Sequence, residues 1–157
     1  MKFNQYFYIF SLEKELTETQ KKTLHDLNKQ IARVKDQKLA PDTPKKDLPL
    51  GMPAAYWIAL KAYDQSATAK RLKQPILVLQ GERDYQVTTA DYDRWKEALS
   101  SRPDATFKLY PRLNHHFMAG EGTPTPAEYD TPGNVSEQVV VDIADWIKRT
   151  SNVRTRS

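Results

Sequence analysis

The stretch 74–87, QPILVLQGERDYQV, decides the fold of this 157-residue chain. Its run Ile76–Leu79 is apolar without a break, rich in branched side chains, and closed by Gly81 before charged residues. A run this short cannot make a helix of ordinary length, and its composition is typical of a strand in a parallel sheet. Strands of that kind are covered on both faces, so we expect these four side chains to be buried.

A second strand is predicted at Thr106–Tyr110, where Pro111 stops it because proline cannot donate to a sheet ladder. Between the strands, residues 90–99 place Trp95 and Leu99 at helical spacing. Strand, helix and strand at this spacing predict a parallel βαβ unit with a right-handed crossover. The fold class is therefore α/β.

Two side chains with acid–base chemistry follow these strands. Asp84 comes just after the first strand and His115 just after the second. Because the carboxyl ends of parallel strands share one edge of a sheet, we expect the two to meet there. Taken singly, Asp84 fits a turn residue that accepts backbone hydrogen bonds, and His115 fits a structural histidine. The pairing favours catalysis over either reading.

A metal site built from Glu82, Asp84, His115 and His116 is an alternative, but no recognised ligand spacing supports it, so we expect no metal and no cofactor. The chain has no cysteine, which excludes a thiol nucleophile and thiolate ligands. A net charge of +4 is modest, and basic and acidic residues alternate over 13–47. We therefore predict no nucleic-acid binding.

No apolar run approaches the roughly 18 residues of a membrane span, so no membrane insertion is expected. In the N-terminal sequence MKFNQYFYIFSL, Asn4 and Gln5 interrupt the apolar run, and no small-residue cleavage site precedes Glu13. This pattern does not fit a secretory signal, and we expect a cytoplasmic protein. The aromatic-rich stretch Tyr6–Leu12 fits either a helix or a strand.

The N-terminal third of the chain has helical signals. Residues 17–20 (TETQ) match a capping box, which starts a helix. An apolar stripe follows, and Pro41, Pro44 and Pro49 end that helix. Pro53 then begins a second helix with an aromatic side that suits a core contact or a pocket wall. The stripe is Leu24, Leu27, Ile31 and Val34, and the aromatic side is Tyr56, Trp57, Leu60 and Tyr63.

The C-terminal part begins with an irregular loop at 118–133 and continues with a helix capped by Asn134 or Ser136. That helix has a broad apolar face, which we expect a sheet to cover: Val139, Val140, Ile143, Trp146 and Ile147. Three regions result: a helical segment at 1–72, a strand–helix–strand–helix portion at 73–150, and a disordered tail at 151–157.

The motifs LQGERDYQV and YPRLNH resemble the C-terminal half of bacterial α/β-hydrolases, in the esterase branch related to dienelactone hydrolases and acyl-peptidases. The similarity extends from about Gln5 to Ile147, and SLEKELTETQ and LPLGMPAAYW look like the helical lid of that branch. The resemblance implies a Ser–His–Asp catalytic triad with Asp84 as the acid and His115 as the base. Those roles fit the physics of a histidine oriented by a carboxylate.

The sequence departs from that family in three ways. Arg112 stands where glycine is usual, His116 adds a second imidazole, and the chain contains no GxSxG nucleophile motif. We therefore expect a serine-type carboxylic-ester hydrolase lineage that holds the acid and the histidine but is truncated and inactive alone. A nucleophile-bearing half would complete it for a small ester or acyl substrate. The alternative is a non-catalytic interaction module, or a homo-oligomer, that pairs through an open strand edge.

Overall fold

The computed structural model describes residues 8, 11–13 and 15–154, so most of the stretch Tyr6–Leu12 lies outside the described residues. Two compact units are present, one of residues Phe10–Gln65 and one of Ser66–Ser157, with Met1–Ile9 grouped with the second. The boundary lies between Gln65 and Ser66, whereas the sequence predicts it at residue 72. Among the described residues, no helix combines the length and apolar character needed to cross a membrane.

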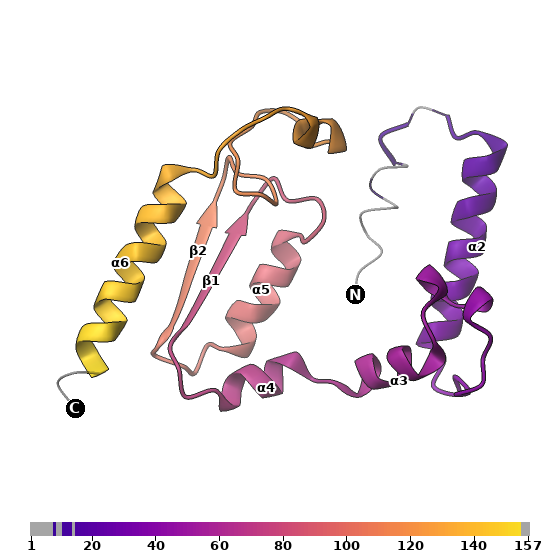
Figure 1. The fold of residues 1–157 in the computed structure, drawn as a ribbon, viewed down its shortest axis with the longest axis horizontal. Helices are drawn as coiled ribbons and strands as arrows, with labels where there is room; N and C mark the ends of the chain where they lie inside the picture. The colour runs from indigo at the N-terminus through magenta and orange to yellow at the C-terminus, as the bar shows by residue number, and fades with distance from the viewer. Residues whose placement is uncertain (1–7, 9–10, 14, 155–157) are drawn as a thin grey trace. The chain divides into compact units, whose positions relative to one another are not determined.

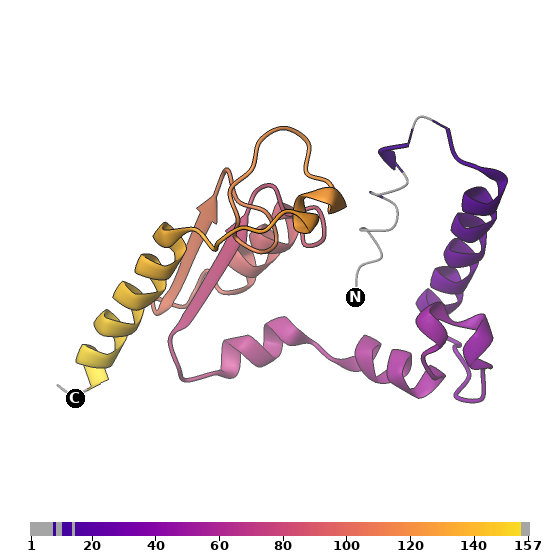
Figure 2. The ribbon, with the colours of Figure 1, turned by 45° about the horizontal axis from the view of Figure 1, so that its top comes forward.

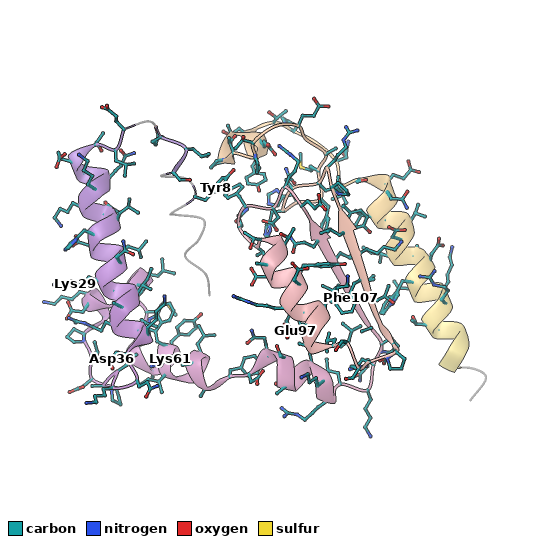
Figure 3. The ribbon with its side chains drawn as sticks, turned by 180° about the vertical axis from the view of Figure 1, so that it is seen from behind. Tyr8, Lys29, Asp36, Lys61, Glu97 and Phe107 are labelled. Carbon is teal, nitrogen blue, oxygen red and sulfur yellow. The ribbon has the colours of Figure 1, made fainter. Side chains whose placement is uncertain are left out.

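The first unit is helical and contains α2 (Glu18–Lys35), η1 (Lys45–Asp47), η2 (Pro49–Gly51) and α3 (Ala54–Ala62). The predicted capping box is confirmed, because Thr17 and Gln20 satisfy each other's backbone N–H groups. Trp57 of α3 is buried, as is Val34 at the end of the α2 stripe. Lys61 ties the two helices together by donating to the Asp36 carbonyl at 2.6 Å (Figure 3).

The second unit contains α4 (Gln65–Arg71) from its second residue onward, followed by β1 (Ile76–Gly81), α5 (Thr89–Ala98), β2 (Ala105–Tyr110), η3 (Pro126–Asp130) and α6 (Glu137–Arg154). The described residues form one two-stranded sheet, in which β1 and β2 are parallel from Ile76↔Ala105 to Gly81↔Tyr110 (Figure 1). The predicted βαβ unit is confirmed. Both strands end at the same level of the sheet.

Helices α5 and α6 lie on either side of this sheet (Figures 1 and 2). Phe107 of β2 meets Tyr92 of α5 edge to face at 6.0 Å. Tyr110, three residues on, points the other way, and its hydroxyl donates to Asp142 of α6 at 2.8 Å. This alternation is the period-two geometry of a strand. Lys108 shares the α6 face, and its bond to Asp142 holds the pKa of that carboxyl below its usual value.

Burial of the sheet is shallower than the sequence predicts. Ile76–Leu79 are half-buried rather than buried. On α6, Val139 is buried, but Val140 is 55% exposed and Ile147 is 50% exposed. A parallel strand is covered fully only when it has neighbours along both edges and helices on both faces. Here each described strand has a partner along one edge, so the predicted burial is wrong.

Helix α6 also extends further than predicted. It continues through Arg154, into the stretch 151–157 that the sequence assigns to a disordered tail. Each added residue of a formed helix gains a hydrogen bond, and residues 151–154 contain neither proline nor glycine. The rest of that stretch lies outside the described residues.

Candidate active site

Asp84 lies in the turn that follows β1, and its carboxylate orders that turn. One oxygen, Oδ1, accepts hydrogen bonds from the backbone N–H groups of Gln86 (2.8 Å) and Val87 (2.9 Å). A short acidic side chain that accepts from backbone amides two and three residues on is a turn-forming arrangement. The residue is 7% exposed. The structural role considered for Asp84 is therefore present, and it uses only one of the two carboxylate oxygens.

Gln80, at the end of β1, supports the same turn. Its side-chain amide donates to the carbonyl of Val87 at 2.7 Å and lies 3.5 Å from Asp84 Oδ2. Gln80 is buried, so these bonds satisfy a polar group that would otherwise lose its water. This role of Gln80 is not apparent from the sequence. The only available signal was a polar residue inside an apolar strand.

His115 lies in a tight loop after β2, and Asn114 builds that loop. The Asn114 side-chain oxygen accepts from the backbone N–H groups of His116 (3.0 Å) and Met118 (3.1 Å). Its own backbone N–H donates to the Met118 carbonyl at 3.0 Å. Phe117 has a φ of 56°, a left-handed conformation that a bulky residue rarely adopts. The chain therefore reverses direction sharply, with His115 within the turn.

The two loops touch along their backbones. Arg83 N–H donates to the Leu113 carbonyl at 3.0 Å, and Glu82 N–H donates to the Tyr110 carbonyl at 3.0 Å. Gly81 makes this approach possible, because a Cβ at that position would lie 2.3 Å from the Leu113 carbonyl oxygen. The acid loop and the histidine loop are therefore one packed unit.

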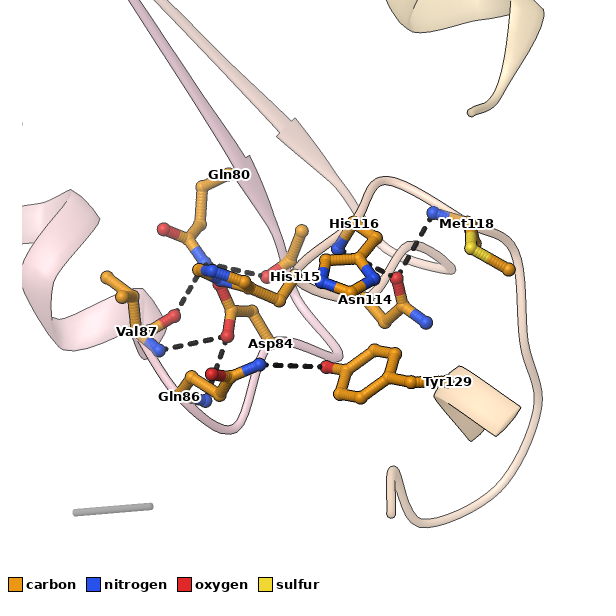
Figure 4. A network of polar contacts seen from close by, with 10 residues as sticks. Gln80, Asp84, Gln86, Val87, Asn114, His115, His116, Met118 and Tyr129 are labelled. Carbon is orange, nitrogen blue, oxygen red and sulfur yellow. Dashed lines mark hydrogen bonds and ion pairs between the residues drawn. The ribbon is translucent and has the colours of Figure 1, made fainter. Parts of the chain in front are cut away.

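Asp84 and His115 meet as the topology predicts. His115 Nδ1 lies 2.7 Å from Asp84 Oδ2 (Figure 4). A carboxylate accepts hydrogen bonds, so Nδ1 carries the proton and Nε2 is left with a lone pair. The Asp84 side chain is 6% exposed and the His115 side chain 38% exposed. The geometry provides a shielded carboxylate that orients an accessible imidazole.

His116 lies against a different neighbour. Its ring is 4.4 Å from the Tyr129 ring, centroid to centroid, and 5.8 Å from the His115 ring (Figure 4). Tyr129 also accepts a hydrogen bond from the Gln86 side chain at 3.2 Å. The predicted choice of His115 as the partner of Asp84 therefore agrees with the geometry.

An aromatic stack lies beside the pair. The ring of Tyr85, next to Asp84 in the chain, stacks on Tyr8 with centroids 4.8 Å apart and on Tyr129 at 6.1 Å. Burial raises the pKa of the Tyr85 hydroxyl to about 12. The Tyr8 hydroxyl donates to the Pro124 carbonyl at 2.7 Å. Tyr85 is therefore a neutral packing residue at ordinary pH.

Among the described residues, no group of three or more His, Cys, Asp or Glu side chains is arranged to hold a metal ion. Glu82, Asp84, His115 and His116, considered together in the sequence, do not form such a group. The chemistry that this geometry supports directly is proton transfer by an oriented histidine.

A carboxylate and a histidine, placed in that chain order beyond the carboxyl ends of parallel strands, fit the arrangement found in the α/β-hydrolase class. The sequence model of the dienelactone hydrolase family matches residues 47–151, and the chain belongs to that family. It is also 38% identical over 117 residues to Esterase EstD of Thermotoga maritima. That alignment covers 74% of this chain and 27% of the esterase. No solved structure matches the chain.

Proposed function

We propose that the chain supplies the acid and the base of a Ser–His–Asp triad in a carboxylic-ester hydrolase. The serine would come from a segment outside these 157 residues, in the same polypeptide or another. One observation carries the proposal: the 2.7 Å contact between His115 Nδ1 and a carboxylate whose other oxygen is fixed by two backbone amides. Membership of a hydrolase family supports the same reaction class.

The proposed mechanism assigns separate roles to Asp84 and His115. Asp84 holds the imidazole with Nδ1 protonated and stabilises the imidazolium that forms. His115 Nε2 takes the proton of the serine hydroxyl as that oxygen attacks the ester carbonyl, and then returns the proton to the leaving alcohol. In the second half of the reaction the same nitrogen deprotonates the water that attacks the acyl-enzyme, and it returns that proton to the serine oxygen as the bond between serine and acyl group breaks and the acid leaves.

We also propose that the helical segment at 1–72, which includes the Phe10–Gln65 unit, is the counterpart of the helical lid of that esterase branch. Its support is the resemblance of SLEKELTETQ and LPLGMPAAYW to lid segments and the compactness of the unit.

A chimera tests the proposed reaction. The segment of Esterase EstD that aligns with this chain would be replaced by the corresponding 117 residues of this chain. We expect the chimera to hydrolyse p-nitrophenyl acetate, and His115→Ala or Asp84→Asn to lower kcat by about 10³-fold or more.

His116→Ala is the matched control for the chimera, because His116 is also an exposed imidazole but lies against Tyr129. We expect this variant to keep most of the activity. Circular dichroism reports whether the chimera is folded. If a folded chimera keeps the same turnover after His115→Ala, the proposal is contradicted.

The chain by itself is expected to show no turnover that depends on His115. It has no GxSxG motif, and an oriented histidine without a nucleophile and an oxyanion hole lacks most of the catalytic machinery. The measurement is hydrolysis of p-nitrophenyl acetate by the purified chain and by its His115→Ala variant. A rate that falls in the variant would show that the chain is catalytic alone.

A second candidate function is association through exposed apolar groups, with a partner or with a second copy. It is favoured by the exposure of Val140, Val141 and Ile147 on α6, at 55%, 44% and 50%. Apolar residues gathered on one helix are a common feature of interaction sites. Sedimentation velocity over a range of concentrations would test it, and a monomer throughout would count against self-association.

A further inference from the structure

Glu128 joins the two loops that carry the acid and the histidine. It lies on η3, in the irregular segment after the histidine loop. Its carboxylate forms an ion pair with Arg83, the residue before Asp84. The same carboxylate accepts a hydrogen bond from the side-chain amide of Asn114, the residue before His115, at 3.2 Å. Each of its two partners is therefore one residue away from a member of the Asp84–His115 pair.

The contact with Arg83 is two-pronged and shielded. Arg83 Nη1 donates to Glu128 Oε2 at 3.1 Å, and Nη2 donates to Oε1. The Arg83 side chain is 10% exposed and that of Glu128 23% exposed. Parallel hydrogen bonds between a guanidinium and a carboxylate are strong and fix relative orientation. Arg83 holds the Glu128 carboxyl in its charged form, and the pKa of Glu128 is lowered although burial opposes this.

Arg83 also ties down the segment between the histidine loop and η3. Its guanidinium donates to the backbone carbonyls of Glu121 (2.8 Å) and Gly122 (3.3 Å). The side chain passes so close to Gly120 that a Cβ there would lie 2.1 Å from Nη1. One cation therefore holds the segment that follows the histidine loop at several points.

Asn114 transmits this constraint to the histidine. Its side-chain oxygen is occupied by the N–H groups of His116 and Met118, so its nitrogen must find an acceptor elsewhere. Asn114 is 2% exposed, so water does not provide that acceptor. Glu128 does. Without it, a buried amide would be left unsatisfied, and the loop conformation around His115 would lose stability.

We propose that Glu128 is a positioning residue that holds His115 against Asp84 by clamping Arg83 and Asn114. This inference rests on the proposed function, in which the Asp84–His115 contact is used for catalysis. Glu128 touches neither member of the pair in any contact described above, so it acts through its two partners. Small displacements of an oriented base are costly to catalysis.

The test is the solvent-exchange rate of the His115 Nδ1 proton, measured by NMR on the full chain, in which a proton bonded to a carboxylate gives a resolved downfield signal. Asp84→Asn identifies the signal by removing it. We expect Glu128→Ala to speed exchange about tenfold, because a buried charge-assisted bond is lost. Glu128→Gln and Arg83→Lys should speed it less, since each keeps one hydrogen bond but not the paired charges.

Asp130→Asn is the matched control, since Asp130 lies on the same short helix and is exposed. We expect this variant to leave the exchange rate unchanged. Backbone amide spectra of β1 and β2 report whether each variant is folded. If Glu128→Ala does not fold, the exchange rates of the His115 Nδ1 proton in Glu128→Gln and Arg83→Lys provide the test instead.

Unchanged exchange in every folded variant at Glu128 and Arg83 would overturn the inference while leaving the Asp84–His115 pair in place. A wild-type chain with no downfield signal that depends on Asp84 would instead overturn the proposed function. The two failures are therefore distinguishable.

Discussion

Each oxygen of the Asp84 carboxylate has a different set of partners. Oδ1 holds the turn through the amides of Gln86 and Val87, and Oδ2 faces His115. A carboxylate fixed in this way cannot rotate without breaking backbone hydrogen bonds. The imidazole therefore meets an acceptor whose position is already set, which is the condition for efficient proton transfer.

Gly81 occupies a position where there is no room for a side chain. We expect Gly81→Ala to destabilise the protein by about 1–3 kcal/mol, because the new methyl group would meet backbone carbonyls at Leu113 and Asn114. The measurement is the free energy of unfolding in urea.

Gly133→Ala is the control for Gly81→Ala. A Cβ at Gly133 would meet the tip of the flexible Met118 side chain, which can move aside. We expect a much smaller loss of stability there. Equal losses at the two positions would contradict the close-approach argument for Gly81.

The Glu128 carboxylate should make stability depend on pH. Arg83 lowers its pKa from the usual 4.5. The stabilisation is therefore present above about pH 4.5 and lost as pH falls through the folded-state pKa. Arg83 is the charged group that interacts with it most directly, and Tyr8, whose pKa is raised from 10.0, is neutral over the range tested below.

Urea unfolding from pH 7 to pH 3 measures this dependence as the difference in stability between wild type and Glu128→Gln. We expect the difference to be largest at the upper end of the range and to shrink below about pH 4.5. Asp130→Asn is again the control. A difference that stays constant across the range would show that the carboxylate charge contributes nothing.

At the residue scale, the sequence predicts the contact between Asp84 and His115 better than it predicts the residues that support this contact. Asp84 and His115 follow strand ends, and topology alone brings strand ends together. Glu128 gives no comparable signal, because it lies in an irregular loop whose path depends on its own contacts with Arg83 and Asn114. The supporting roles of Gln80 and Asn114 are likewise not marked in the sequence, because their hydrogen-bond partners are set by the folded loops around them.

Among the elements, helix α2 has a start that can be tested independently of the site. Thr17 accepts from Gln20 N–H, and the Gln20 side chain accepts from Thr17 N–H at 2.8 Å. We expect Thr17→Ala to destabilise α2 by about 1 kcal/mol, because a helix-terminal amide loses its acceptor. Hydrogen exchange of the α2 amides measures this loss.

Thr19→Ala is the matched control for the cap, since Thr19 is exposed in the first turn of the same helix. We expect little change, because the Thr19 contact that reaches Thr23 is made by its backbone carbonyl and survives the substitution. Identical protection in wild type and Thr17→Ala would refute the capping role.

Element identities were predictable because the signals are local. The capping box, the apolar run of β1 and the proline after β2 each act over a few residues. Burial was less predictable. Whether Val140 of α6 is covered depends on how many strands lie beneath the helix. The apolar pattern of the helix does not reveal the number of strands in the sheet.

Over the whole molecule, the exposed apolar side of α6 predicts self-association. We expect replacement of Val140 and Ile147 by lysine to lower the sedimentation coefficient at high concentration, because both residues are half-exposed and lie two helical turns apart. Asp145→Lys is the control, since it adds positive charge at a 57% exposed position on the same helix. Unaltered association in the double variant would exclude this side of the helix as the contact.

The in-register pairing of Gly81 with Tyr110 makes insertions and deletions unequal in effect. One residue added inside β2 would advance the chain by about 3.3 Å and turn every later side chain to the opposite face. Tyr110 would then face α5, and His115 would move out of reach of Asp84. An addition in the exposed turn at Ser100–Ser101 leaves the strand ends level. We therefore expect the protein to tolerate an inserted residue in the turn before β2, whereas an insertion inside β2 would break the contact between Asp84 and His115.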